Sequence, residues 1–289
     1  MKNIARQRLP TPILVAMVFS AFAIPPIVSS YSIADPNIGK HRKMNQYSII
    51  HTNILTVENN YQLVKSRIRD KLKAWPEMFR FDDTLKQIHY ETEGPLIPED
   101  NGKTPVLILL SNPHPHSVKQ GMILSPNRNG KENAFWETMR NTGFFKHEKA
   151  IDAPMMIRNQ YQSPFRFFMA VILPFPTEYP DDLIDIFGNT GYVRMMNQGE
   201  EEIKSLIDLN NIQHVICFGK TQYDVLSRMP SPKNYTSTLK EGNIIQNSSR
   251  FSDDVKVFLT FPTGWRFMKN AKEIKAESLK QVFAAIDNN

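Results

Sequence analysis

The sequence predicts an α/β fold with three layers, α/β/α, in which helices cover both faces of a largely parallel central sheet. Two observations predict it over residues 101–289. Short apolar runs of strand length alternate with longer segments of helical period, and polar or turn residues separate them. Ahead of this domain we expect a leader at residues 1–35 and a helical extension at residues 36–100.

Four strands are expected in the domain, each a short apolar run. They are Val106 to Leu110, Phe168 to Leu173, His214 to Phe218 and Val255 to Thr260. The expected helices are Glu132 to Thr142, Glu200 to Asn210, Thr221 to Arg228 and Lys272 to Asp287. The three glutamates at 200–202 favour a helix start there, because negative charge is stabilised at a helix N-terminus. The order strand, helix, strand makes successive strands parallel.

The first 35 residues have the pattern of a secretory signal. Lys2, Arg6 and Arg8 precede an apolar run that ends in Ala21-x-Ala23. The apolar run continues to Val28, so a membrane anchor with transient membrane contact is a weaker alternative. If translation instead starts at Met44, the protein is cytoplasmic. Between Met44 and Asp100, the segment Tyr61 to Leu72 has helical period and predicts a helical extension.

The composition and the absence of certain motifs limit the classes of function that this chain can have. The 35 Lys and Arg against 29 Asp and Glu give a net charge of +6, which is compatible with a polyanionic partner but shared by many other proteins. A single cysteine, Cys217, excludes an internal disulfide and a cysteine-rich metal site. No Walker loop, dinucleotide fingerprint or Gly-x-Ser-x-Gly elbow is present, so those enzyme classes have no support.

Three segments that contain candidate catalytic or binding residues follow predicted strands. Asn112 follows the first strand, Gly219-Lys220 the third and Pro262-Thr-Gly-Trp the fourth. In sheets of this kind the reactive groups lie at the carboxyl ends of the strands. The sequence therefore predicts one site at one edge of the sheet.

An ordered set of motifs carries a family resemblance. Residues 109–117 read Leu-Leu-Ser-Asn-Pro-His-Pro-His-Ser, followed by Gly121, Asn133-Ala-Phe-Trp and Gly143-Phe-Phe. Later segments, residues 214–223 and 260–266, follow in matching order. The set resembles the mismatch-specific uracil/thymine DNA glycosylases of the uracil-DNA glycosylase superfamily, over residues 101–289, about two thirds of the chain.

The resemblance implies hydrolysis of the N-glycosidic bond of uracil or another deaminated or mismatched base in DNA, by a monomer without metal or cofactor. It gives Asn112 the catalytic role of holding the attacking water. It places His114, Gly121, Met122, Leu124 and Asn133 around the base. Trp265 would be the apolar wedge in the minor groove. The remaining expected DNA contacts are Ser117, Lys119, Lys220, Thr263, Gly264, Arg266 and Lys269.

The chain departs from the family pattern at three positions. His114 replaces a small glycine, Leu124 replaces an aromatic residue that stacks on the base, and Phe261 replaces an Asn or His. Plainer interpretations also exist: Asn112-Pro113 as a turn, the run at 122–124 as a buried strand, Asn133 as an orienting residue of its helix, and Lys220 as a surface lysine. The alternative hypothesis is an exported, non-catalytic protein of this fold that binds a nucleobase-like small ligand.

Overall fold

The computed structural model describes residues 49–127, 129–264 and 270–288. Its main sheet has five strands in the order β5-β4-β6-β8-β7, and all but β7 run parallel to their neighbours. Their bounds are Thr104–Leu110 for β4, Phe165–Val171 for β5, His214–Phe218 for β6, Ile245–Ser248 for β7 and Lys256–Thr260 for β8. The predicted α/β class with a largely parallel sheet is confirmed.

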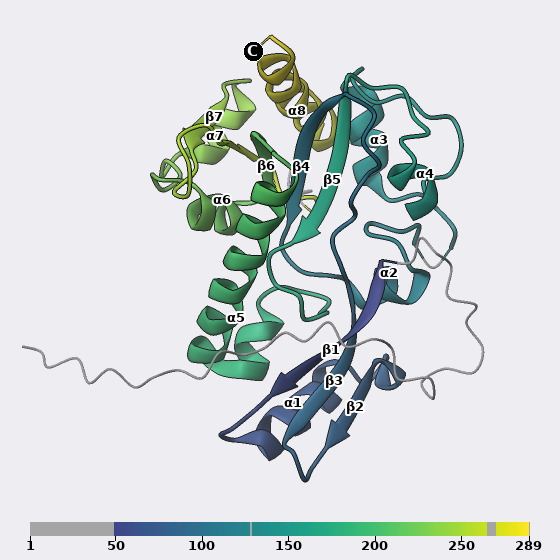
Figure 1. The fold of residues 1–289 in the computed structure, drawn as a ribbon, viewed down its shortest axis with the longest axis vertical. Helices are drawn as coiled ribbons and strands as arrows, with labels where there is room; N and C mark the ends of the chain where they lie inside the picture. Colours follow the sequence, from purple (N-terminus) through teal and green to yellow (C-terminus); the bar gives the residue numbers. More distant parts are fainter. Residues whose placement is uncertain (1–48, 128, 265–269, 289) are drawn as a thin grey trace, which may run out of the picture. The chain divides into compact units, whose positions relative to one another are not determined.

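Helices cover both faces of this sheet. Figure 1 shows α5 (Asp182–Leu209) and α6 (Lys220–Leu226) on one side, and α3 (Ala134–Asn141) and α4 (Ala153–Ile157) on the other. Alternate strand residues divide between two cores. In β4, Leu107 and Leu109 pack into the cluster that contains α5, whereas Val106 and Ile108 pack into the cluster that contains α3. Because both faces are buried, the centres of the parallel strands β4, β5, β6 and β8 are apolar, as is typical of parallel sheets.

The remaining helices of the domain join the same two cores. Leu239 of α7 (Tyr235–Lys240) lies in the cluster that contains α5, whereas α8 (Ala271–Asp287) packs on α3 and lies in the cluster that contains α3 and α4. Helix α2 (Pro115–Gln120) is a short helix between β4 and α3. The observed layers are therefore consistent with an α/β/α arrangement.

The predicted elements differ from the observed ones at α5, at β7 and at the short helices α2, α4 and α7, which the sequence analysis did not predict. Helix α5 begins at Asp182, so the glutamates at 200–202 lie inside a helix rather than at its start. The negative first turn is supplied by Asp182 and Asp185 instead. Strand β7 was not predicted, because its sequence Ile-Gln-Asn-Ser is short and mostly polar.

The helical extension is the clearest correction to the sequence analysis. The expected helix is present as α1 (Tyr61–Lys71), but strands β1 (Ile50–Thr56), β2 (Phe79–Asp82) and β3 (Gln87–Glu93) form an antiparallel sheet in the order β1-β3-β2. The alternation Phe79-x-Phe81 and Ile88-x-Tyr90 is the strand signal that was missed. A short 3-10 helix, η1 (Pro76–Met78), precedes β2.

The predicted leader at residues 1–35 lies outside the described residues, so its role as signal or anchor stays a prediction. Among the residues that are described, no helix has the length and apolar character needed to cross a membrane.

We predict that Gly199→Ala destabilises the protein. A Cβ at Gly199 would lie 1.7 Å from the carbonyl oxygen of Ile172, so α5 packs backbone against backbone just after β5. The clash should outweigh the roughly 1 kcal/mol helix preference of alanine over glycine and lower the free energy of unfolding by about 2 kcal/mol or more. Urea unfolding measures this. The exposed neighbour Asn197→Ala is the matched control, and equal stability of the two variants would refute the packing argument.

We also predict a pH-dependent stability that originates at Glu93. Burial raises the pKa of this carboxyl from 4.5 to about 8, and Oε1 has no hydrogen-bond partner among the described residues. The folded state therefore binds the proton more tightly than the unfolded state. Stability falls as pH rises between these two values, by up to about 1.4 kcal/mol per pH unit.

The variant Glu93→Gln removes this titration, so its advantage over wild type in free energy of unfolding should grow from pH 5 to pH 8. Urea unfolding at several pH values measures the difference. A difference that stays constant over this range would show that Glu93 does not titrate there.

Candidate functional site at the carboxyl edge of the sheet

The strand order creates a switch point beside β4. The chain passes from β4 to β5 on one side and then crosses to β6 on the other side of β4. Ligands of open α/β sheets bind at the carboxyl ends of the strands where the order reverses. Asn112 follows β4, Gly219 follows β6 and Thr263 follows β8, and the parallel register brings all three segments to the same edge, as predicted.

The side-chain amide of Asn112 is held in one orientation. Its Nδ2 donates to the carbonyl oxygen of Thr177 at 2.9 Å, to Oγ1 of Thr177 at 2.9 Å and to the carbonyl oxygen of Pro113 at 3.2 Å. These acceptors fix which end of the amide is the nitrogen. No described residue donates to Oδ1, and the residue is partly exposed. Asn112 therefore presents a fixed hydrogen-bond acceptor at the edge.

Thr177 is a site residue that the sequence analysis missed. It lies in the loop after β5, is fully buried, and its backbone N–H donates to the carbonyl oxygen of Pro113 at 3.2 Å. Its hydroxyl donates to the carbonyl oxygen of Tyr179 at 2.8 Å, which leaves the hydroxyl oxygen to accept from Asn112. The sequence signal that could have indicated Thr177 is its position after a predicted strand, because that strand also ends at this edge. The ring of Tyr179 is 67% exposed beside this loop.

Gln222 joins the ends of β4 and β6. With its amide oriented to satisfy both groups, the oxygen accepts from the backbone N–H of Ser111 at 2.9 Å and the nitrogen donates to the carbonyl oxygen of Gly219 at 3.1 Å. Gly219 has φ 141°, and a Cβ there would lie 2.8 Å from the Gln222 side chain. The positive φ of Gly219 favours glycine in the Gly-Lys turn, and a side chain there would also displace the Gln222 amide. The sequence analysis missed Gln222.

The residues from His114 to Ile123 cap and end α2 or pack in the core, and they do not line a pocket as predicted. Nδ1 of His114 accepts from the backbone N–H of His116 at 3.1 Å and caps α2. Gly121 has φ 77° and ends α2, a conformation that favours glycine. Met122 and Ile123 are buried in the core with α3. The predicted pocket floor is therefore part of the core, and the run at 122–124 is not a strand.

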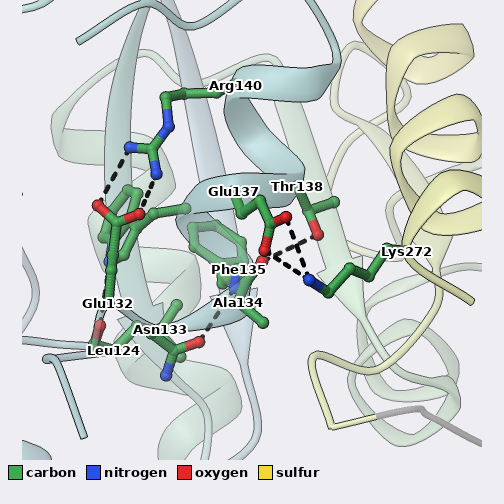
Figure 2. Close-up of polar contacts among 10 residues, drawn as sticks. Leu124, Glu132, Asn133, Ala134, Phe135, Glu137, Thr138, Arg140 and Lys272 are labelled. Atoms are coloured by element: carbon green, nitrogen blue, oxygen red, sulfur yellow. Dashed lines mark hydrogen bonds and ion pairs between the residues drawn. The ribbon is translucent and has the colours of Figure 1, made fainter. Parts of the chain in front are cut away.

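Figure 2 shows how the segment before α3 is fixed. The indole N–H of Trp136 donates to the carbonyl oxygen of Leu124 at 3.0 Å, and Leu124 has φ 55°. Oδ1 of Asn133 accepts from the backbone N–H of Phe135 at 3.0 Å, so Asn133 is the N-cap of α3. The same view shows Lys272 of α8 paired with Glu137 of α3 at 2.9 Å.

The segment after β8 is anchored by a buried lysine. Nζ of Lys275 on α8 donates to the carbonyl oxygen of Thr263 at 3.1 Å, and this lysine is 8% exposed. Phe261 is buried, and with Phe135 and Phe218 it lines a small pocket that also includes Thr263 and Lys275. Asn112 does not line this pocket. Gly264 is exposed, whereas Trp265, Arg266 and Lys269 lie outside the described residues.

The other expected DNA contacts have partners within the protein. Ser117 is buried against Ser125, with 3.4 Å between the hydroxyl oxygens, and is not placed to contact a phosphate. Lys119 pairs with Glu77 at 2.8 Å, and Lys220 pairs with Asp224. The interpretation of Lys220 as a surface lysine therefore fits the structure best.

Net charge is distributed unevenly. Residues 1–48 hold six Lys and Arg against one Asp, which is five of the six net positive charges of the chain. Residues 49–289 are therefore close to neutral.

Among the described residues no group of three or more His, Cys, Asp or Glu could hold a metal ion. No protein-family model and no curated protein matches the sequence.

We predict that Asn133 stabilises the protein by capping the N-terminus of α3. Asn133→Ala removes the acceptor for the Phe135 N–H and should lower the free energy of unfolding by about 1 kcal/mol. Asn133→Asp keeps an acceptor in the same place and should stay within about 0.5 kcal/mol of wild type. Urea unfolding of the two variants measures the difference. Equal losses in both would contradict the capping role.

Proposed function

We propose that the domain at residues 101–289 is uracil-DNA-glycosylase-like and hydrolyses the N-glycosidic bond of uracil or another deaminated or mismatched base in DNA. The proposal rests on the resemblance of the ordered motifs and on one observation of geometry. The amide of Asn112 has its nitrogen committed to Thr177, and no described residue donates to its oxygen, which is left to accept a hydrogen bond.

The chemistry needs a water molecule at the anomeric carbon and an extruded nucleotide. A neutral amide oxygen is too weak a base to remove a proton from water fully. It can accept a hydrogen bond from that water and fix its approach while the base departs and the sugar becomes oxocarbenium-like. Holding the Asn112 amide in advance means that no rotamer must be selected during the reaction.

The duplex would be held by the edge segments rather than by a broad basic surface. Thr263 and Gly264 begin the loop in which Trp265 would act as the wedge, with Arg266 and Lys269 beside it. Lys275 fixes the start of this loop through the carbonyl oxygen of Thr263. Tyr179 adds an exposed ring at the same edge, where it could stack on an unpaired base.

We predict that Asn112→Ala lowers the rate of base removal by about 100-fold or more, since the attacking water loses its positioning contact. The full chain is incubated with labelled duplexes that carry uracil, a G·T pair, hypoxanthine or ethenocytosine, and abasic product is measured in single turnover. Duplex affinity should change less than twofold. The control Asn197→Ala makes the same chemical change at an exposed position of α5 and should keep wild-type activity.

Wild-type protein that yields no abasic product from any of these duplexes would refute the enzymatic proposal. So would product formed equally by wild type and Asn112→Ala.

The near-neutral charge of residues 49–289 favours a second candidate, an exported protein of this fold that binds a nucleobase-like small ligand. Phe261, which fills part of the edge with an aromatic ring, supports it too. The two candidates differ in their response to salt, because phosphate contacts make DNA affinity fall steeply with salt concentration. Duplex binding that is absent at low salt, with uracil or another free base binding to the protein, would favour the small-ligand candidate.

A further inference from the structure

We propose that the N-terminal unit, residues 49–93, is a positioning element that holds the Asn112 amide in its working orientation. The unit comprises β1, α1, η1, β2 and β3. The inference rests on the proposed function, since it concerns the residue assigned there to catalysis. It gives a role to an extension that the resemblance leaves unexplained.

The first contact of the unit is with the loop after β5. Phe175 in this loop is fully buried, with its ring 5.5 Å from Phe79 of β2 and 4.6 Å from Tyr90 of β3, centroid to centroid. Phe187 of α5 packs on the same ring at 4.9 Å. The unit therefore encloses Phe175 from two of its strands.

The second contact fixes the backbone of the same loop. The hydroxyl of Thr92 on β3 donates to the carbonyl oxygen of Pro174, and Thr92 is fully buried. Thr177, the residue that accepts both short hydrogen bonds from the Asn112 amide, is only three positions after Pro174. A loop held at Pro174 and Phe175 leaves Thr177 little freedom, so the position of Asn112 is tied to β3.

The third contact reaches the other side of Asn112. Trp75 and Met78, which flank and end η1, pack with Val118 of α2 in a separate apolar cluster. Lys119 of α2 pairs with Glu77 of η1 at 2.8 Å. Helix α2 begins at Pro115, three residues after Asn112. The unit thus supports both the loop that binds the Asn112 side chain and the helix that follows its backbone.

These contacts matter because an amide side chain can rotate. Catalytic groups must be held within about 0.5 Å and 10–20° of the productive geometry by surrounding residues that are themselves fixed. Thr177 supplies the direct contact, and the N-terminal unit fixes Thr177. Thr92 and Phe79 are therefore positioning residues rather than catalytic ones.

The test uses the full chain and the pair Thr92→Val and Thr92→Ser. Valine has nearly the shape of threonine but lacks the hydroxyl, whereas serine keeps it. We expect Thr92→Val to lower the single-turnover rate of base removal about tenfold while duplex affinity stays within twofold. Thr92→Ser should keep the rate within about threefold of wild type.

A second pair tests the aromatic contact with matched residues of one strand. Phe79→Leu removes the ring that stacks on Phe175, whereas Phe81→Leu makes the same change at a ring that faces Lys65 and Arg69. Both side chains are partly buried. We expect a slower reaction for Phe79→Leu only, after correction for any fraction of unfolded protein.

A readout independent of activity separates failure of this inference from failure of the proposed function. The side-chain NH2 signals of Asn112 in a ¹⁵N NMR spectrum are identified by their loss in Asn112→Ala. They should shift, and their protons should exchange faster with water, in Thr92→Val and in Phe79→Leu.

An inactive wild type would refute the proposed function but leave this measurement intact. Unchanged Asn112 signals in folded Thr92→Val and Phe79→Leu would overturn the inference. An equal loss of rate in Thr92→Val and Thr92→Ser, or in Phe79→Leu and Phe81→Leu, would overturn it as well.

Discussion

The hydrogen bonds from the Asn112 amide to Thr177 are the constraint on which the site depends. They connect the end of β4 to the loop after β5. The segments that follow two neighbouring parallel strands therefore fix the orientation of one side chain. Gln222 makes a second connection of this kind between the ends of β4 and β6. Thr177 and Gln222 are buried, so leaving their polar groups unpaired would be costly. These bonds therefore fix the positions of the strand ends relative to one another.

Several residues of the motif have structural roles that explain their identity without a ligand. Gly121 ends α2 with a positive φ, Asn133 caps α3, and Trp136 binds the carbonyl oxygen of Leu124. These residues are therefore explained by how this edge is built. The proposed chemistry rests more narrowly on Asn112, because no donor among the described residues contacts its side-chain oxygen.

The charge distribution limits how the domain would bind DNA under the proposed function. The net positive charge lies almost entirely in residues 1–48, so the domain itself has no large excess of basic residues. Lys119 and Lys220 are engaged with Glu77 and Asp224. Binding by the domain would thus depend on a few contacts from the loop after β8 and on aromatic surface, rather than on long-range attraction.

The sequence by itself determined the α/β class, the parallel strands and the edge where Asn112, Gly219 and Thr263 meet, because apolar runs and their alternation with helices report local period and burial. Only the tertiary structure decided that residues 50–93 form mainly an antiparallel sheet, and that Thr177 and Thr92 support Asn112. The reason is physical. Those contacts join residues 65 and 82 positions apart, and no local pattern encodes which distant backbone carbonyl a side chain will meet.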